Sequence, residues 1–497
     1  MDRRRREPPW LVIAGLLAVL LAIVLLVALL RGGGDDETPQ PAALPADPGT
    51  TTPLGRLALA TLRPDVEADA DELTARAEAG FANPLYRMVP GGAVASAARV
   101  TRLRPLIEQV AEEQDEDADT LEALVYLESA GRPEAMASND VKGAVGLTQI
   151  LAETGTSLLG MKIDVQRSQT LTRLINRGGR HEARRRAERA KVDPRFDPKQ
   201  ALEGTARYLE FAREQLGDRD DLAVASYHMG VGNLQNALRD FGQGDVPYVE
   251  LYFGTDPLRT PAATKRLMDL SDDSSSYLWR IGAAARIMRQ YREDRPALER
   301  EAELQTRKAS SEDLLHPKET TPTFADAEAL ERATADGELI ALPRDALRAN
   351  GLAIDPAMGE LADRFDQPRS RYRALRPGAL GGVLTIGAAV RALNGTTEPA
   401  TRLTVTSTVR DEEYQARLGA ENIQATKALS QHTTGWAVDF SRSYRTGAQA
   451  QLFQWTLTRL QALNLIAWVR EPTAIHMTFS DEATERFAPI LRAAQRP

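Results

Sequence analysis

Residues 117–150 read DADTLEALVYLESAGRPEAMASNDVKGAVGLTQI, and they place a carboxylate where a helix normally carries an apolar side chain. Leu121, Leu124 and Val125 lie seven, four and three residues before that carboxylate, Glu128. At these spacings a helix brings all of them onto one face, which should be buried or line a cleft. A carboxylate there loses hydration. Its pKa should therefore rise towards the value that a general acid needs near neutral pH.

The helix is expected to end just after this position, because Ser129 is followed by Gly131. Taken alone, Glu128 is more simply explained as a helix-terminal side chain in solvent. Two downstream motifs favour a site instead. They are GAVGLTQI at residues 143–150 and AVASYHMGVGNL at residues 223–234.

Together, Glu-Ser, Gly-Leu-x-Gln and Ala-x-Tyr-x-x-Gly resemble, in this order, the soluble lytic transglycosylase family of lysozyme-like murein enzymes. The resemblance covers about residues 99–295 and implies an all-α lysozyme-like domain with Glu128 as its catalytic residue. Thr148 stands where the family usually has Met, and His228 where it usually has Asn. The residues that the resemblance assigns to glycan binding are Ser129, Gly146, Leu147, Thr148, Gln149, Tyr227 and His228.

The roles of the last two residues stay open. The Tyr227 hydroxyl can bond to protonated Glu128 or hold the acetamido group of a sugar; the alternative is a half-buried core tyrosine. The resemblance favours a site role for Tyr227, whereas His228 is equally well explained as structural or as a contact to sugar.

The number of carboxylates bears on the mechanism. Ordinary glycosidases use two, but Glu134, Asp140 and Glu153 do not stand in a pattern that marks a partner for Glu128. The resembled family uses one carboxyl, which protonates the glycosidic oxygen and then accepts the proton of the muramic acid 6-hydroxyl. A 1,6-anhydro product results, and intramolecular attack gains effective molarity over attack by water. Hydrolysis on the same fold, as in goose-type lysozymes, is the alternative.

The N-terminal region predicts a membrane anchor. Four arginines lie within residues 1–7, residues 10–30 are an apolar run of spanning length, and acidic residues follow at 35–37. The positive-inside rule then leaves the N-terminus in the cytoplasm of a bacterial cell and the rest outside. A cleavable signal peptide is the alternative, although no small-x-small cleavage site ends the run.

The predicted architecture is multi-domain. After the cytoplasmic arginines and transmembrane helix (1–31) we expect a disordered spacer (32–56) and the transglycosylase domain (57–295). A basic helical insertion near 160–196 is either a solvated helix or a contact to anionic wall polymers. Residues 296–330 should be a linker before a C-terminal domain (331–497).

The C-terminal domain carries a second constellation. The run SQHTTGWAVD at residues 430–439, followed by IAWVREPTAIHMTF at residues 466–479, resembles the zinc D-alanyl-D-alanine carboxypeptidase and dipeptidase family. The resemblance covers about residues 375–480 and implies an α+β domain with a small antiparallel sheet. Its zinc ligands map onto His432, Asp439 and His476. Three protein ligands leave a fourth position open, as in catalytic zinc sites.

Two further residues join this constellation. Pro472-Thr473 predicts a hairpin, and a loop of two or four residues puts Glu471 and His476 on the same sheet face. Glu471 can then act as the base towards water at the metal. The resembled family has two residues between this Glu and His, however, and this chain has four. Arg410, which follows a predicted strand, matches the family residue that polarises the scissile carbonyl or stabilises the oxyanion.

Composition excludes several classes of function. The 497 residues carry a net charge of −8, which argues against a nucleic-acid-binding surface, and they include no cysteine, so any zinc site must use His and carboxylate ligands. We therefore expect an enzyme that cuts both the glycan strands and the stem peptides of peptidoglycan. The alternatives are a transglycosylase with a metal-free peptidoglycan-binding module, or an inactive wall scaffold.

Overall fold

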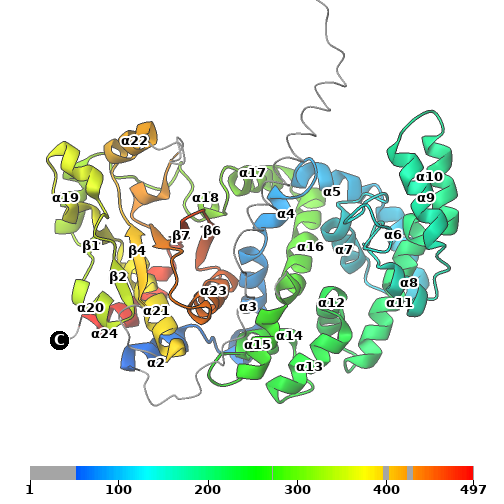
Figure 1. The fold of residues 1–497 in the computed structure, drawn as a ribbon, viewed down its shortest axis with the longest axis horizontal. Coiled ribbons are helices and arrows are strands. Elements are labelled where there is room, and N and C mark those ends of the chain that lie inside the picture. The colour runs from blue at the N-terminus through cyan, green and yellow to red at the C-terminus, as the bar shows by residue number, and fades with distance from the viewer. Residues whose placement is uncertain (1–51, 271–272, 396–401, 422–428, 496–497) are drawn as a thin grey trace, which may run out of the picture. The chain divides into compact units, whose positions relative to one another are not determined.

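A computed structural model describes residues 52–270, 273–395, 402–421 and 429–495 (Figure 1). The predicted anchor at residues 10–30 and most of the predicted spacer lie outside these ranges. Among the helices that are described, none combines the length and the apolar character needed to cross a membrane.

The middle of the chain is helical, as the lysozyme-like resemblance predicts. One of its long helices, α16 (Tyr277–Glu293), packs against α3, α5, α7 and α12. The helices of this region are α3 (Val66–Gly80), α4 (Asn83–Arg87), α5 (Ala93–Thr101), α6 (Arg104–Gln114), α7 (Ala118–Ser129), α8 (Ala152–Ser157), α9 (Val165–Asn176), α10 (Glu182–Val192), α11 (Pro198–Gln215), α12 (Asp220–Met229), α13 (Val231–Phe241), α14 (Tyr248–Gly254), α15 (Pro261–Asp269) and α17 (Arg295–Thr306).

Local sequence signals set the ends of the helices around the site. Asp117 caps α7 by accepting a hydrogen bond from the backbone of Thr120. Asp197 caps α11 in the same way, and Pro198 occupies the first helical position, where its missing N–H costs nothing. These caps fix the helices that carry the first candidate site.

The C-terminal region is built on a five-stranded sheet in the order β2-β4-β5-β7-β6. Its strands are β2 (Leu352–Ile354), β4 (Leu403–Ser407), β5 (Ala437–Ser441), β6 (Ile466–Arg470) and β7 (Ala474–Phe479). The small sheet predicted as antiparallel is present and its pairs are antiparallel except one, because β2 pairs with β4 in parallel. The short strand β2 pairs with β4 through Leu352 and Leu403, and sequence periodicity carries no sign of such a pairing.

Helices surround this sheet. They are α18 (Glu312–Leu315), α19 (Ala327–Ala335), α20 (Arg344–Ala349), α21 (Pro377–Asn394), α22 (Glu412–Glu421), α23 (Gly447–Ala462) and α24 (Ala483–Ala494), and two short strands, β1 (Ile340–Ala341) and β3 (Ala374–Leu375), form a separate pair. α21 is buried along almost its whole length. Gly382 lets Phe479 pack against it, since a Cβ there would lie 2.1 Å from the phenylalanine ring.

The predicted domain boundaries differ from the structure. Helix α2 (Pro53–Thr61) begins inside the predicted spacer and packs on α21 and α24, so it belongs with the C-terminal region although it precedes the helical region in sequence. Residues 296–330 are not a free linker: α17 packs on α4, α5 and α16, and Phe324 is buried among C-terminal residues. The charged and proline-rich composition of this segment predicted a linker. Composition does not show which of its polar groups find buried partners, and therefore the prediction failed.

Direct contacts join the helical region to the C-terminal region. Arg459 of α23 is buried and donates hydrogen bonds to the carbonyl oxygens of Tyr252, Phe253 and Thr255, at the C-terminal end of α14, at 2.9, 2.6 and 2.9 Å. The backbones also meet at Gly80, where a Cβ would lie 1.9 Å from the carbonyl oxygen of Gln461. A cation placed at a helix C-terminus satisfies orphan carbonyls and complements the helix dipole.

Candidate functional site

Glu128 lies in the last turn of α7, with its side chain partly accessible. The helix ends at Ser129, as predicted, and Ala130 and Gly131 follow in the left-handed region. Three residues predicted to share its face are fully buried: Leu121, Leu124 and Val125. The carboxyl therefore stands at the edge of an apolar surface while it stays open to a substrate.

Tyr277, the first residue of α16, donates a hydrogen bond of 2.5 Å to Oε1 of Glu128. Burial raises the pKa of Glu128 to about 7, and this hydrogen bond offsets only part of the rise. A carboxyl with such a pKa is present in both protonation states near neutral pH. It can therefore give up a proton and take one back.

Within the part of the chain that the structure describes, no second carboxylate contributes to the pKa shift of Glu128. Burial and Tyr277 are the influences on its pKa, and no acidic side chain in the described ranges adds to them. Of the nearby candidates, Glu134 is paired with Arg186 at 2.7 Å and with Arg189. Glu153 is exposed on α8. Among the described side chains, Glu128 is thus the one carboxyl at this edge of α7 whose pKa is raised.

Tyr227 lies next to Tyr277, and its hydroxyl bonds to a backbone carbonyl group instead of to Glu128. Its hydroxyl donates to the carbonyl oxygen of Thr148 at 2.9 Å, and its ring stacks on that of Tyr277 with centroids 6.2 Å apart. The bond to Glu128 that the sequence suggested for Tyr227 is thus made by Tyr277. His228, which is exposed, stacks on the same ring at 5.3 Å.

The Gly-Leu-Thr-Gln motif forms a tight turn beside α7. Gly146 has a φ of +83°, and a Cβ there would lie 1.9 Å from the carbonyl oxygen of Arg195, so only glycine fits. Gln149 donates to the carbonyl oxygens of Gly146 and Ala135 at 2.8 and 3.2 Å and keeps its side chain partly accessible. The turn thus positions Gln149 as the accessible polar side chain of the motif.

A buried ion pair stabilises this turn through hydrogen bonds to its backbone. Arg195 and Asp193 are both fully buried and lie 2.8 Å apart. Arg195 also donates to the carbonyl oxygens of Val141, Gly143 and Ile150 at 2.6, 3.1 and 3.0 Å. Sequence reasoning missed this arginine because it lies at the end of the predicted insertion, among other basic residues.

Not all of the predicted substrate-binding residues are accessible. Ser129, Gly146, Leu147 and Thr148 are buried, so their side chains support the site and do not line it. Thr148 is fully buried because the turn points its side chain inwards, which corrects the expectation that it faces the glycan. Gln149, Tyr227 and His228 remain accessible around Glu128.

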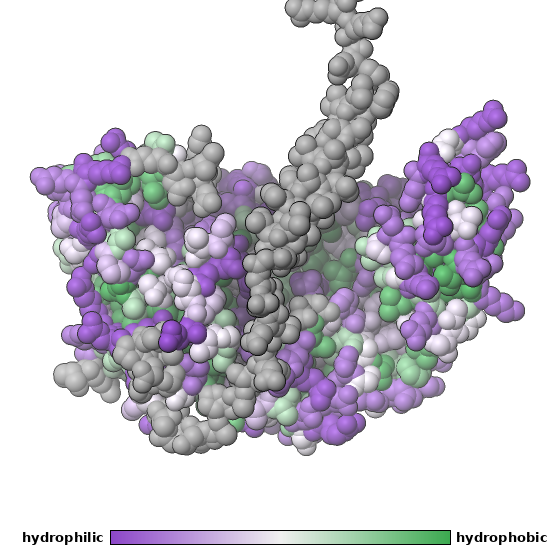
Figure 2. Space-filling model, in the orientation of Figure 1, coloured by the Kyte–Doolittle hydropathy of each residue, from purple (hydrophilic) through white to green (hydrophobic). Residues whose placement is uncertain are grey.

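The basic insertion forms the helical hairpin α9–α10, near the predicted bounds, and Figure 2 shows hydrophilic side chains gathered over these helices. Some of its arginines are structural. Arg189 is buried, bonds Thr172 at 2.9 Å, pairs with Glu134 and lies 3.5 Å over the ring of Phe196. Part of the positive charge of the insertion is therefore buried and paired, and is not available to bind a polymer at the surface.

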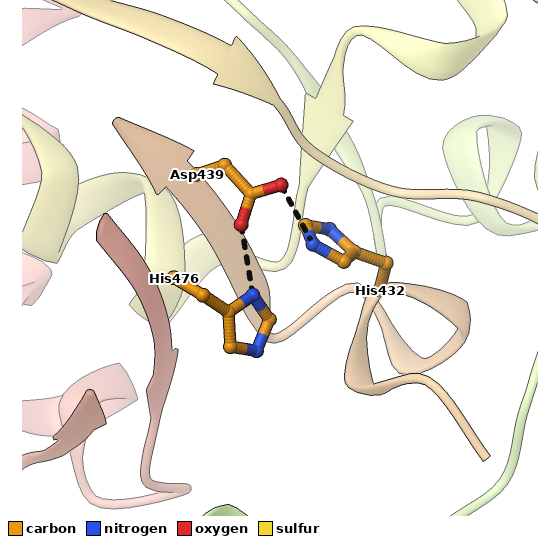
Figure 3. Close-up of side chains that lie close together, drawn as sticks. All are labelled: His432, Asp439 and His476. Atoms are coloured by element: carbon orange, nitrogen blue, oxygen red, sulfur yellow. Dashed lines mark hydrogen bonds and ion pairs between the residues drawn. The ribbon is translucent and has the colours of Figure 1, made fainter. Parts of the chain in front are cut away.

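The second candidate site lies on the C-terminal sheet (Figure 3). Asp439 on β5 and His476 on β7 are direct cross-strand partners and so project from the same face. His432 reaches them from the turn at Gln431–Thr434. One ligand atom from each of the three residues lies within 4.8 Å of the others, which confirms the expectation that these side chains meet.

Hydrogen bonds fix how the two imidazoles point. Nδ1 of His432 lies 2.7 Å from the carbonyl oxygen of Thr408 and must donate to it, which leaves Nε2 facing Asp439 at 3.2 Å. Nε2 of His476 lies 2.7 Å from a carboxylate oxygen of Glu312, and its Nδ1 faces Asp439 at 2.8 Å. Each ring thus directs one nitrogen at Asp439 and has an acceptor on the other, the arrangement that metal-ligating histidines adopt.

Charge also gathers around this cluster. Burial lowers the pKa of His476, but Glu312 and Asp439 outweigh it and raise the pKa to about 10. In its protonated form His476 donates one N–H to Asp439 and the other to Glu312, and the two hydrogen bonds hold the ring in place. The donor set of two imidazoles and a carboxylate fits zinc and needs no residue to move far.

The other two predicted residues lie at the same cluster. Arg410 is 3.5 Å from Asp439 and is held by Ser407 at 2.7 Å and by Gln415 at 2.9 Å. The hairpin loop is Pro472-Thr473, so Glu471 follows Val469, the partner of His476, on the same face, as predicted for a two-residue loop. Partial burial and nearby Asp439 raise the pKa of Glu471.

Sequence reasoning missed two residues that contact these sites. Tyr277 follows three serines, a context without a motif, and Glu312 lies in the segment predicted as a linker. His316, in the same segment, is buried, stacks on Trp436 and bonds the carbonyl oxygen of Phe479 at 2.6 Å. Neither the spacing of apolar residues along a helix nor the presence of turn-forming residues predicts the contacts of Tyr277, Glu312 and His316.

Comparisons with known proteins locate the similarity in the helical region. Residues 105–246 match the family model described as "Transglycosylase SLT domain". Two relatives from Alkalilimnicola ehrlichii are "Membrane-bound lytic murein transglycosylase F 2", 32% identical over 162 residues, and "Membrane-bound lytic murein transglycosylase F 1", 32% identical over 147 residues. The matches cover 31% and 28% of this chain, and 28% and 23% of the relatives. The part of the chain that holds Glu128 is thus similar to transglycosylase SLT domains.

Proposed function

We propose that this protein cleaves the glycan strands of peptidoglycan as a lytic transglycosylase, with Glu128 as its single acid and base. The observation that carries the proposal is the partly accessible Glu128 carboxyl, with a pKa raised to about 7 and a tyrosine as its hydrogen-bond partner. The similarity of residues 105–246 to transglycosylase SLT domains supports it.

In this mechanism Glu128 first protonates the oxygen of the bond between N-acetylmuramic acid and N-acetylglucosamine, and the C1–O bond breaks. The carboxylate then accepts the proton of the muramyl 6-hydroxyl, whose oxygen bonds to C1 and closes the 1,6-anhydro ring. No water is consumed. Tyr277 can stabilise the carboxylate between the two steps by donating to it, since a hydrogen bond to the charged form favours that form.

Mass spectrometry of muropeptides released from purified sacculi tests the proposal. We expect products with 1,6-anhydromuramic acid ends from the wild-type protein and none from E128Q. Reducing ends would identify a hydrolase of the goose-type lysozyme kind. Absence of any release by the wild-type protein would favour an inactive scaffold.

We further propose that the C-terminal region is a zinc-dependent peptidase that acts on D-amino-acid bonds of the stem peptides. His432, Asp439 and His476 would hold the ion, and the directed ring nitrogens support this assignment. Zinc in such a site supplies Lewis acidity towards a carbonyl group and makes water more acidic. Arg410 would bind the carbonyl oxygen of the substrate, and Glu471 would take a proton from the attacking water.

Metal analysis of the purified full chain, together with a peptidase assay on a disaccharide pentapeptide, tests this second function. We expect one zinc per chain and release of D-alanine. A protein without zinc that binds sacculi would instead identify a metal-free peptidoglycan-binding module.

The proposed location is the bacterial cell membrane, with residues 10–30 as a single anchor and both sites outside the cytoplasm. The support is the apolar run in the sequence and the membrane-bound state named for the two relatives. Fractionation of cells is expected to place the full chain in the membrane. Release from the membrane by high salt alone would contradict an integral anchor.

A further inference from the structure

The segment between α17 and α19 is built into the C-terminal region. Residues 307–316, here called the connector, contain α18 and four ionisable side chains that are buried or nearly buried. These are Lys308, Glu312, Asp313 and His316. Burial of so many ionisable groups is costly unless they find partners, so the contacts of each one matter.

Glu312 is 4% exposed and makes three polar contacts. Its Oε2 accepts from Nε2 of His476 at 2.7 Å and from the hydroxyl of Thr478 at 3.1 Å. Its Oε1 lies 2.7 Å from the ammonium group of Lys308. One carboxylate thus ties the connector to two residues of β7, and one of them is a proposed metal ligand.

The contact determines which way His476 presents its ring. With Nε2 donating to Glu312, the other nitrogen is the one that faces Asp439 and His432. The carbonyl oxygen of Thr408 does the same for His432. The backbone of the C-terminal region thus orients one imidazole, and a side chain from outside the sheet orients the other.

We propose that Glu312 is the positioning residue of the metal site, and that the connector, by supplying it, completes a site whose ligands all lie more than a hundred residues further along the chain. The proposal rests on the proposed zinc site and deepens it. Glu312 does not bind the ion or the substrate. It acts through His476 by fixing the tautomer and the orientation of the ring and by raising its basicity as a ligand.

A purely structural role is the competing explanation, since Glu312 also pairs with Lys308. The two explanations differ in what they predict for zinc affinity. A structural pair would lower the stability of the fold when broken and leave the affinity of the folded protein for zinc unchanged. A positioning carboxylate changes the affinity itself.

The test measures the zinc affinity of the full chain by competition with a chromophoric chelator at fixed pH. We expect Glu312→Ala to weaken zinc binding about 10- to 100-fold, the range for loss of an outer partner of a ligand. Glu312→Gln keeps the volume and one acceptor oxygen, so a smaller loss is expected. Glu319→Gln is the matched control, because Glu319 is 60% exposed and pairs with Arg307 at the surface.

A second measurement reads the contact directly. The chain has five histidines, so labelling them with nitrogen-15 gives a simple spectrum. In the zinc-loaded wild-type protein we expect one imidazole N–H proton protected from exchange by its bond to Glu312. That signal should move or vanish in Glu312→Ala and remain in Glu319→Gln.

The outcomes separate the two proposals. If the wild-type protein binds no zinc, the proposed metal site and this inference both fail. If it binds zinc and Glu312→Ala binds it equally well, only the positioning role is overturned. Should Glu312→Ala fail to fold, Glu312→Gln decides, and wild-type affinity with an unchanged spectrum would overturn the inference.

Discussion

Two glutamates of this protein, the partly accessible Glu128 and the buried Glu312, show how loss of hydration can lead to opposite chemistry. Burial raises the pKa of Glu128 to about 7, because the partner it meets is the neutral hydroxyl of Tyr277. Burial also acts against the charge on Glu312, but His476 and Lys308 outweigh it and lower the pKa to about 2. The first carboxyl can exchange protons near neutral pH, whereas the second stays ionised and can only hold its neighbours.

The difference teaches that burial alone does not assign a role to a carboxylate. What decides is whether the partners are neutral donors or cations. Four substitutions test the difference between the helical region, which holds Glu128, and the C-terminal region, whose cluster Glu312 contacts.

The largest effect is expected for E128Q. Glutamine keeps the shape of the side chain but cannot donate or accept the proton, so glycan cleavage should fall by at least about 10²- to 10⁴-fold, the usual contribution of general acid–base catalysis. Anhydro-muropeptide release from sacculi measures it, and zinc content should not change. E153Q, at an exposed glutamate of α8, is the control. Retention of most of the activity in E128Q would remove Glu128 from the chemistry.

The next effect concerns H432A. Loss of one of three proposed ligands should weaken zinc binding more than about 100-fold, beyond the range for an outer partner. Chelator competition measures it, and glycan cleavage should persist because the helical region holds its own acid. His181→Ala, at an exposed histidine, is the control. Loss of glycan cleavage in H432A would show that the two sites are not independent.

The contact between the two regions can be broken at Arg459. The substitution R459M leaves three carbonyl oxygens at the end of α14 without their buried donor. The free energy of unfolding should fall by about 3 kcal/mol, since a hydrogen bond to a charged group contributes about 1.5–3 kcal/mol. Calorimetry checks it against R445M, an exposed arginine near the start of the same helix. Equal melting temperatures would mean that this contact contributes no stability.

The smallest effect is a shift in pH dependence in Y277F. The Tyr277 hydrogen bond lowers the pKa of Glu128, so its removal should raise that pKa further. Activity that needs the protonated acid is lost as pH rises through the pKa, so the alkaline limb of the rate profile should move to higher pH. Y291F on the same helix should leave the limb in place. A shift to lower pH in Y277F would contradict the sign of the Tyr277 contribution.

Much of the local structure was predictable because its causes lie close together in sequence. The buried face of α7, its end after Ser129 and the hairpin that presents His476 all follow from apolar spacing or turn residues. The meeting of His432, Asp439 and His476 was also expected, from the resemblance of residues 430–439 and 466–479 to a family that binds zinc through His, Asp and His.

The failures share a physical reason. The 296–330 segment was predicted to be a linker on the basis of its charge, yet Glu312 and His316 are buried because residues more than a hundred positions away supply their partners. Thr148 was expected at the surface, but the turn formed around Gly146 points it inwards. Composition and spacing describe what a residue can contact, not what surrounds it.

By itself, the sequence determined that Glu128 stands on an apolar helix face, because helical periodicity acts over a few residues, and that two histidines and an aspartate follow near the C-terminus. Only the tertiary structure decided the partners of these groups: Tyr277 for Glu128, Arg195 behind the Gly146 turn, and Glu312 for His476. Such partners come together when distant segments pack. They also determine whether a buried carboxylate carries a proton or a charge.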